Sequence, residues 1–276
     1  MENRNNRFSP FIDAKVDTQF KRAGVYNWIG SDNEKWFSQN IIRRPDLLQT
    51  YIDNPIKYDI NKQGFRSKFD FEPYNNKDVD LALGCSHTFG VGHYLENTWV
   101  DMLSKETGRE VINLGSPGHG MEVHYINACK YTDYFENVKN VFLYQPVYTR
   151  YHYFHYVGFH GGEFTHCSAF DYPGHDSGFK LKYNSDYVNR TLTKEYMYYV
   201  HFRMADAIEG LCHRKGINLI SIFDEPTDYG LTLKKDLKDG PILKKPKEGD
   251  IVARDFWHFP KSSNIEIFNW FNDKLK

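Results

Sequence analysis

The sequence predicts a three-layer αβα domain built on a mostly parallel sheet. The main observation is that short apolar segments alternate with helical patterns from Val79 onward, which is typical of parallel strands whose connecting helices cover both faces of the sheet. The chain has 276 residues, enough for one large α/β domain. Apolar residues make up 40% of it, so it can bury a substantial core.

The N-terminal part differs from the rest of the chain. Residues 1–78 are polar with scattered aromatic side chains, and we interpret them as an extension packed on the main domain, residues 79–276. Within the extension, residues 33–54 have the apolar spacing of a helix, and Pro45 interrupts it.

The main domain contains the predicted strands and helices. Four apolar segments are predicted as strands, at residues 79–84, 110–115, 138–145 and 217–223. Helical patterns occur at residues 94–108, after Met121, around 187–215 and at about 264–275. Ligands in such sheets bind beyond the carboxyl ends of the strands, so the residues that follow each strand are the first candidates for a site.

Two insertions interrupt this alternation, at residues 150–186 and 230–250. The first is rich in aromatic residues and histidine, but its histidines are irregularly spaced and form no HExxH motif. We therefore predict no metal site there and interpret them as substrate-wall or surface residues. The second contains lysines interspersed with acidic residues, which indicates a solvated face, with attraction of an anionic substrate as the alternative.

Composition excludes several classes of protein. The formal net charge of −1 argues against a nucleic-acid partner, which normally meets a basic face. No apolar stretch reaches the roughly 20 residues that cross a bilayer, and the N-terminus lacks a secretory signal, so we expect no membrane partner and a cytoplasmic location. The four cysteines form no CxxC pair, which argues against a disulfide framework or a zinc cluster.

A serine directly follows the first predicted strand, in the sequence LALGCSHTFGVG. Alone, Ser86 would be read as a helix N-cap. A serine nucleophile needs a base and a group that orients the base. Asp255 and His258 supply that pair, because residues three apart share one face of a helical turn. The backbone N–H groups of Ser86 and Gly115 are the candidate oxyanion donors.

At these residues the sequence resembles the SGNH, or GDSL-type, hydrolase superfamily. The segment LGCSHTFG at 83–90 is similar to the first family block, GDSxTxG, and NLGSPG at 113–118 to the second. The last block, which holds the acid and the base, is matched by DFWH at 255–258. The resemblance extends from about residue 59 to the C-terminus, apart from the two insertions.

Two positions depart from the family pattern. Cys85 stands where the family has aspartate. We interpret it as a packed side chain and not as an alternative nucleophile, because neighbours in an extended strand point to opposite faces. The third block, GxND in the family, reads LYQPVYTR here and lacks the asparagine that donates to the oxyanion. The amide of Gln145 is a candidate replacement.

The resemblance implies a flavodoxin-like sheet and ester hydrolysis through an acyl-enzyme, with Ser86 as nucleophile, His258 as base and Asp255 as the orienting acid. It implies no metal or organic cofactor. The implied substrate is a small ester, such as an O-acetyl group on a carbohydrate, and His87, Tyr148 and Arg150 are candidate substrate contacts.

Three alternatives stay open. Transfer of the acyl group to a hydroxyl acceptor would use the same residues. A binding or structural protein could keep the fold without turnover. The altered blocks and aromatic-rich composition also resemble SGNH-like proteins of tailed phages, which would imply a virion-associated role.

Overall fold

The protein is described from a computed structural model that covers most of the predicted main domain and extension. The residues it describes are 23–72, 77–148, 150–156, 162–168, 194–223, 250–256 and 258–276, with 150–156 and 162–168 as backbone. Most of the two predicted insertions lies outside the described residues.

The centre of the fold is a four-stranded sheet in which every neighbouring pair of strands is parallel. Its order is β4-β3-β5-β8. Counted along the chain this is 2-1-3-4, the order of flavodoxin-like sheets. The predicted strands are thereby confirmed, and their bounds are β3 Asp78–Gly84, β4 Glu110–Asn113, β5 Asn137–Gln145 and β8 Asn218–Phe223.

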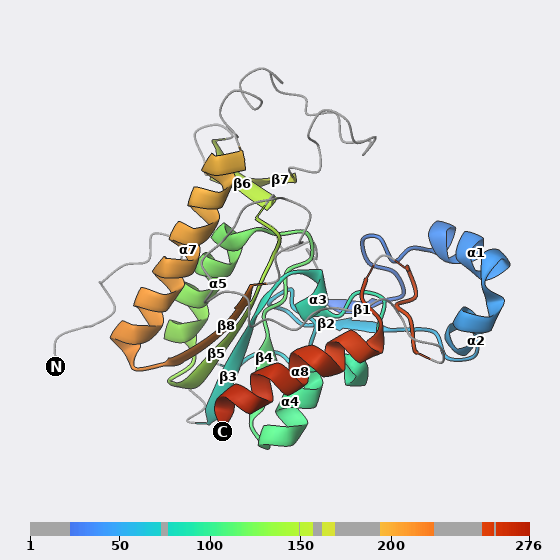
Figure 1. Ribbon diagram of the computed structural model, residues 1–276, viewed down its shortest axis with the longest axis horizontal. Coiled ribbons are helices and arrows are strands. Elements are labelled where there is room, and N and C mark those ends of the chain that lie inside the picture. Colours follow the sequence, from blue (N-terminus) through green and yellow to red (C-terminus); the bar gives the residue numbers. More distant parts are fainter. Residues whose placement is uncertain are drawn as a thin grey trace.

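Helices cover both faces of this sheet (Figure 1). One face packs against α5 (Met121–Tyr134) and α7 (Lys194–Lys215), the other against α4 (Trp99–Thr107) and α8 (Lys261–Leu275). The alternation of side chains along β3 divides the core. Leu81 and Leu83 join the cluster beneath α5 and α7, whereas Ala82 joins the cluster beneath α4 and α8. The predicted three-layer αβα architecture is confirmed.

The described part of the N-terminal segment contains a small two-stranded sheet and two helices. Strand β1 (Gly24–Tyr26) pairs antiparallel with β2 (Tyr58–Ile60). Between them, α1 (Glu34–Arg43) ends just before Pro45, which begins α2 (Pro45–Asp53) because proline is tolerated in the first turn of a helix.

This segment packs against the main domain. Leu48, Tyr51 and Ile56 share one buried cluster with Phe89 and Val252, which come from opposite ends of the main domain's sequence. Figure 1 shows the segment beside the chain that leads into α8. The division into an extension and a domain at residue 78 stays a prediction.

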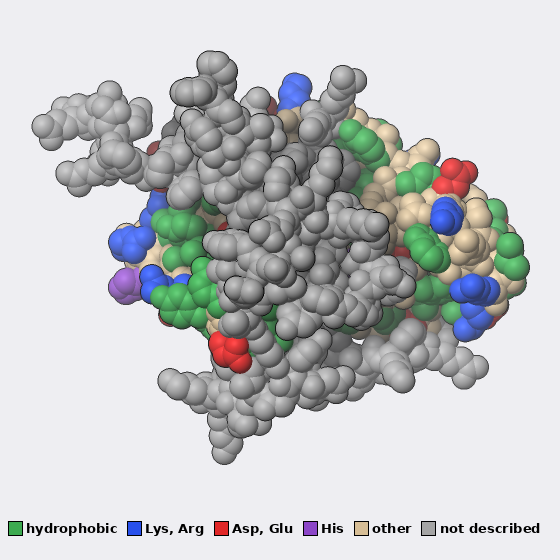
Figure 2. Space-filling view, turned by 90° about the horizontal axis from the view of Figure 1, so that it is seen from above, with side chains coloured by type: hydrophobic (Ala, Val, Ile, Leu, Met, Phe, Trp, Pro, Cys, Tyr) green, Lys and Arg blue, Asp and Glu red, His purple; other side chains and the backbone are tan. Residues whose placement is uncertain are grey.

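The surface at the α1–α2 end carries mixed side chains (Figure 2). Acidic and basic groups lie close together there, as in the ion pair between Arg44 and Asp46, and large apolar side chains such as Ile42 are exposed among them. Neither positive nor negative charge dominates this part of the described surface, so it does not favour a ligand of one charge.

The first predicted insertion begins as a two-stranded hairpin. Strands β6 (Arg150–Tyr156) and β7 (Gly162–Ser168) pair antiparallel, from Arg150 opposite Ser168 to Tyr156 opposite Gly162.

None of the helices in the described ranges is both long and apolar enough to span a bilayer.

Candidate active site

Ser86 lies directly beyond the carboxyl end of β3. The strand ends at Gly84, where a Cβ atom would lie 2.6 Å from the carbonyl oxygen of Tyr144 on β5, so a side chain is excluded. The chain then passes through Cys85 into the short helix α3 (Ser86–Phe89). This strand–turn–helix places Ser86 at the sheet edge where ligands bind in such folds.

Ser86 carries its hydroxyl in a buried position, with the residue 6% exposed. It donates to the sulfur of Cys85 at 3.9 Å. The expectation that these two side chains point to opposite faces is therefore wrong, because the strand ends at Gly84 and its alternation no longer applies. Cys85 itself is buried, as predicted for a packed cysteine.

Asp255 and His258 are in direct contact, as their spacing predicts. Nδ1 of His258 lies 2.7 Å from Oδ2 of Asp255, and the backbone N–H of His258 donates to Oδ1 at 3.2 Å. A carboxylate can only accept, so Nδ1 carries the proton and Nε2 of the neutral ring is left as an acceptor. This is the tautomer that a general base for a serine hydroxyl requires.

The turn that forms this pair contains a backbone conformation that L-residues seldom adopt. Phe256, between Asp255 and His258, has a φ of 58°. Its side chain is 37% exposed, so the conformation is not explained by burial of an apolar ring. The left-handed residue instead bends the chain so that the His258 N–H reaches Asp255.

Asp255 is an ionised carboxylate in a buried position. Burial raises its pKa, but the hydrogen bond from His258, the charge of that imidazole and a hydrogen bond from Ser31 outweigh this, so the pKa is lowered below its ordinary value. Asp255 is therefore charged at neutral pH and can stabilise a positive charge on His258.

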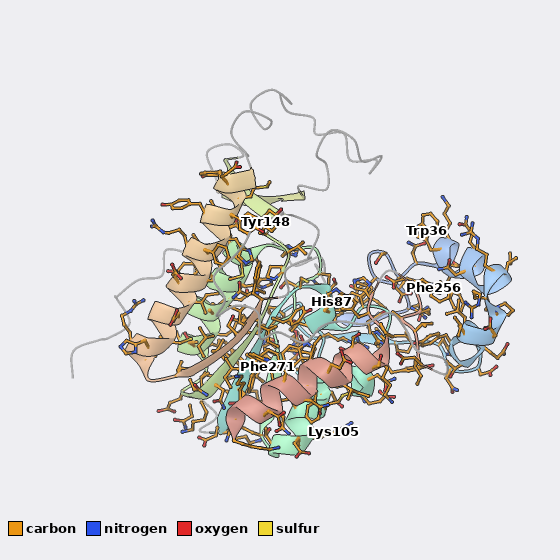
Figure 3. The ribbon with its side chains drawn as sticks, viewed as in Figure 1. Trp36, His87, Lys105, Tyr148, Phe256 and Phe271 are labelled. Carbon is orange, nitrogen blue, oxygen red and sulfur yellow. The ribbon has the colours of Figure 1, made fainter. Side chains whose placement is uncertain are left out.

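The two halves of the predicted site meet at His87, the residue after Ser86, which Figure 3 labels on α3. The His87 ring stacks on Phe259, with centroids 4.1 Å apart, and lies 5.1 Å from the His258 ring. In the part of the chain that the structure describes, no hydrogen bond joins Ser86 Oγ to His258. The His258 imidazole thus lies beside the segment that carries Ser86, but it is not hydrogen-bonded to the Ser86 hydroxyl.

His93 fixes the chain that follows His258. Its Nε2 lies 2.6 Å from the carbonyl oxygen of Phe259. Burial lowers the pKa of His93 to about 4 despite this hydrogen bond, so the ring is neutral at neutral pH. His93 therefore supports the Phe259 backbone without adding a charge beside His258.

The two predicted backbone donors to an oxyanion differ in the structure. The N–H of Ser86, at the start of α3, has no partner among the described residues. The N–H of Gly115 donates to Oδ1 of Asn113 at 2.9 Å. A Cβ at Gly115 would also lie 2.8 Å from Cα of Phe89. Gly115 is thus a close-packing position whose donor is already used, which corrects its predicted role.

Gly118, farther along the same loop, has a backbone N–H that is not engaged in a hydrogen bond with a described residue, unlike the N–H of Gly115. Its φ is 79°. Gly118 was not among the predicted donors.

Gln145 faces away from the predicted oxyanion position. Its Nε2 donates to Oγ of Ser221 on β8 at 2.8 Å, and its Oε1 lies 2.9 Å from Nε2 of His201 on α7. Burial lowers the pKa of His201 to about 3, so this ring is neutral. Because both ends of the Gln145 amide have partners between β8 and α7, the structure does not support the role predicted for it.

The three residues predicted to contact the substrate lie in different parts of the structure. His87 lies at the site, against Phe259 and His258. Tyr148 is buried and stacks on Tyr198 of α7 with centroids 3.8 Å apart, which is a core contact. Arg150 begins β6, and its side chain lies outside the described residues.

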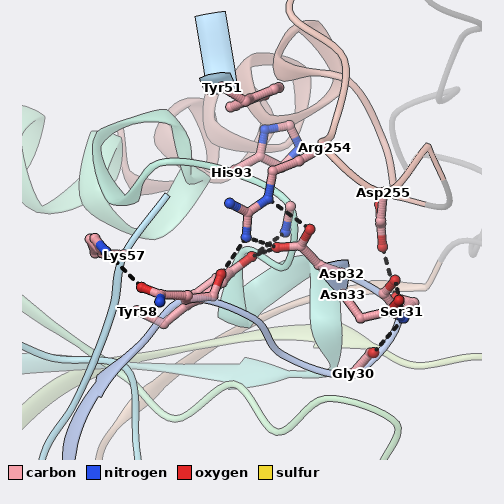
Figure 4. Close-up of polar contacts among 12 residues, drawn as sticks. Gly30, Ser31, Asp32, Asn33, Tyr51, Lys57, Tyr58, His93, Arg254 and Asp255 are labelled. Atoms are coloured by element: carbon pink, nitrogen blue, oxygen red, sulfur yellow. Dashed lines mark hydrogen bonds and ion pairs between the residues drawn. The ribbon is translucent and has the colours of Figure 1, made fainter. Parts of the chain in front are cut away.

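Sequence reasoning missed the contribution of the N-terminal segment (Figure 4). Oγ of Ser31 donates to Oδ2 of Asp255 at 2.7 Å, and Nδ2 of Asn40 donates to the Asp255 carbonyl oxygen at 3.4 Å. The only local signal was Arg254, a basic residue beside the predicted acid whose own partner could not be identified from spacing.

The described residues contain no group of three or more His, Cys, Asp or Glu side chains arranged to hold a metal ion. The polar groups of the predicted site include a hydroxyl, an imidazole–carboxylate pair and backbone N–H donors. Such a set can perform proton transfer and nucleophilic attack.

Comparison with known proteins adds little to this geometry. No protein-family model and no curated protein matches the sequence. One solved structure that it resembles comes from Desulfitobacterium hafniense and is provisionally assigned as a lipolytic protein of the G-D-S-L family. The match has 14% identity and a TM-score of 0.30, and it covers 72% of this chain and 99% of the other. A similarity of this extent does not indicate an activity for this protein.

Proposed function

We propose that the protein is a serine esterase that hydrolyses a small ester through an acyl-enzyme. The observation that carries the proposal is the contact of 2.7 Å between His258 and Asp255, which leaves Nε2 of the imidazole as an acceptor. This pair lies against His87, the residue that follows Ser86 at the carboxyl end of β3. The ordered similarity of three sequence blocks to SGNH hydrolases supports the same reaction.

The proposed reaction begins with rotation of the Ser86 hydroxyl away from Cys85 and toward Nε2 of His258. Sulfur is a weak acceptor, so the bond of 3.9 Å that is lost offers little resistance. Hydrogen bonds between catalytic groups are often long before substrate binds and shorten in the complex.

Oγ of Ser86 then attacks the ester carbonyl while its proton passes to Nε2 of His258. Asp255 stabilises the imidazolium, and the N–H of Ser86 donates to the oxyanion, with the N–H of Gly118 as a candidate second donor. The imidazolium returns the proton to the departing alcohol, which leaves an acyl group on Ser86. Water, deprotonated by His258, attacks this acyl-enzyme and releases the acid, and the proton returns to Ser86.

The near burial of Ser86, at 6% exposure, favours a small acyl group. An O-acetyl ester on a carbohydrate meets this requirement, because the acyl part is short and the sugar can remain outside. Transfer of the acyl group to a hydroxyl acceptor would use the same residues, with the acceptor in the place of water.

Two observations favour a second candidate, a binding or structural protein without turnover. Ser86 Oγ has Cys85 and not His258 as its partner, and the amide of Gln145 is held by Ser221 and His201. In this case the edge of the sheet beyond β3 would bind an acylated carbohydrate without cleaving it.

Hydrolysis of p-nitrophenyl acetate by the wild type and by Ser86→Ala separates the two candidates. For the esterase we expect a loss of about 10³-fold or more in kcat, since removal of a serine nucleophile removes the covalent step. Cys85→Ser is the matched control and should retain activity. Equal rates for wild type and Ser86→Ala would contradict the esterase, and a fluorophosphonate adduct mapped to Ser86 would support it. A glycan array tests the binding candidate.

A further inference from the structure

We propose that Ser31, in the N-terminal segment, is a positioning residue that holds the Asp255 carboxylate in line with His258. This inference rests on the proposed esterase function and adds a fourth side chain to its site. It assigns to the segment before the main domain a direct part in forming the acid–base pair.

The hydrogen bonds around Asp255 carry the proposal. Oδ2 accepts from Oγ of Ser31 at 2.7 Å and faces Nδ1 of His258 at 2.7 Å, while Oδ1 accepts the His258 backbone N–H at 3.2 Å. The Asp255 side chain is fully buried, so water cannot take the place of a missing donor. The orientation of the carboxylate therefore depends on Ser31 as well as on His258.

The backbone around Ser31 is a tight turn that aims the hydroxyl. Ile29 and Asp32 exchange both of their backbone hydrogen bonds, at 2.8 and 3.0 Å, with Gly30 and Ser31 between them. Gly30 has a φ of 60°, and glycine at the first central position is typical of type II′ hairpin turns. Ser31 thus lies at a fixed position at the tip of the turn.

A buried ion pair fixes this turn against the chain that carries Asp255 (Figure 4). Nε of Arg254 donates to Oδ1 of Asp32 at 2.8 Å, and Nη2 donates to Oδ2 at 2.6 Å. Tyr58 also donates to Asp32. Ser31 directly precedes Asp32, and Arg254 directly precedes Asp255. The hydrogen bond between Ser31 and Asp255 therefore lies beside the ion pair between Asp32 and Arg254.

The Ser31 hydroxyl has no role in starting α1. Asn33 is the N-cap, and its Oδ1 accepts from the N–H of Trp36 at 3.0 Å. The Asn33 amide group also donates to the Ser31 carbonyl oxygen at 3.1 Å. The backbone of the turn is thus held by other groups, and the Ser31 side chain serves Asp255.

Loss of the Ser31 hydroxyl should change how the pair titrates. The hydrogen bond from Ser31 helps to lower the pKa of Asp255, so without it the Asp255–His258 pair should bind its proton more tightly. Within the described residues, His93 and Tyr51 are further titratable groups whose charges interact with Asp255. Burial lowers the pKa of His93 and raises that of Tyr51, so both stay neutral near neutral pH. Arg254 is committed to Asp32.

The experiment compares wild type, Ser31→Ala, Ser31→Thr and the control Ser67→Ala in the full chain. Ser67 lies in the same N-terminal segment and donates to the Phe69 carbonyl oxygen, without contact to Asp255. For Ser31→Ala we expect a fall of about 10-fold in kcat for p-nitrophenyl acetate, as for a lost hydrogen bond to a charged group. KM should be unchanged and the acid limb of kcat should move to higher pH, while Ser31→Thr restores both.

A second measurement is independent of turnover. The titration of the Asp255–His258 pair, followed by NMR, should shift to higher pH in Ser31→Ala and not in Ser67→Ala. Identical titrations in these two variants would overturn the role of Ser31, even with an active enzyme. If the wild type lacks esterase activity, the proposed function fails while the NMR titration still decides the role of Ser31. If Ser31→Ala does not fold, Ser31→Cys, which keeps the shape and weakens the donor, takes its place.

Discussion

Arg254 and Asp32, 222 positions apart in the sequence, form a buried ion pair with Nη2 and Oδ2 2.6 Å apart. The guanidinium also donates to the Asn27 carbonyl oxygen and lies over the Trp28 ring at 4.0 Å. The pair joins the N-terminal segment to the chain that carries Asp255. The proposed site is therefore assembled by both ends of the described chain.

Removal of one partner of this pair should destabilise the protein strongly. Arg254→Met leaves the buried Asp32 carboxylate without its cation, which typically costs about 3–5 kcal/mol. The double variant Arg254→Met with Asp32→Leu should lose less, because no charge stays buried alone. Urea unfolding measures both free energies.

The exposed pair of Arg44 and Asp46 is the control for this prediction. Arg44→Met should lower the free energy of unfolding far less than Arg254→Met, because water solvates both charges of the exposed pair. A loss in Arg254→Met no greater than in Arg44→Met would contradict the structural role of the buried pair.

The depressed pKa of Asp255 predicts how its contribution to stability depends on pH. A carboxyl whose folded pKa is below its unfolded value stabilises the protein above the unfolded pKa of 3.8 and loses this effect as pH falls through the folded pKa. The free-energy difference between wild type and Asp255→Asn should thus be larger at pH 7 than at pH 3. Denaturant unfolding at the two pH values measures it, and a difference that grows toward low pH would contradict the assignment.

The same variant tests the orientation of His258. An amide in place of the carboxylate can donate to Nδ1 and favours the other tautomer, with the proton on Nε2. For a Ser-His-Asp site this change costs about 10⁴-fold in kcat. Kinetics with p-nitrophenyl acetate at pH 7 measure the loss, and an active Asp255→Asn would argue that Asp255 has only a structural role.

The left-handed conformation of Phe256 predicts an unusual order of stability. With φ at 58°, alanine and phenylalanine carry a penalty of about 1–2 kcal/mol that glycine avoids. Phe256→Gly should therefore be more stable than Phe256→Ala by about 1 kcal/mol. Thermal unfolding of the two variants measures the difference. Equal stability would mean that this turn relaxes when the ring is removed.

The strands and helices could be predicted because their signals are local. The apolar segments before Ser86 and the helical spacing that Pro45 interrupts depend on neighbouring residues alone. The contact of Asp255 with His258 was predictable for the same reason, since the two are three residues apart.

The remaining contacts of the site depend on tertiary packing. Ser31 and Asp255 are separated by 224 positions, and no pattern in either segment indicates the other. The hydrogen bond from the Gly115 N–H to Asn113, by contrast, could have been predicted from neighbouring residues. Asparagine two residues earlier often accepts from the backbone in this way, which also explains why β4 ends at Asn113 and not at residue 115.

The partners of Gln145 lead to the sharpest test of the oxyanion site. Gln145→Leu removes the amide that joins Ser221 to His201 and leaves the buried His201 ring and the half-buried Ser221 hydroxyl with one partner fewer. The loss in stability should be about 1–3 kcal/mol. Because the amide does not face Ser86, kcat per folded molecule should stay within a few-fold of wild type.

The opposite result would restore the prediction made from the sequence. A donor to the oxyanion typically contributes about 10²–10³ in kcat. A loss of that size in Gln145→Leu, with little change in the free energy of unfolding, would show that the amide turns toward the substrate during the reaction. Ser221→Ala is the matched control, since it removes the acceptor of the Gln145 amide and leaves Gln145 itself in place. It should reduce stability without lowering kcat, because Ser221 has no contact with the proposed nucleophile.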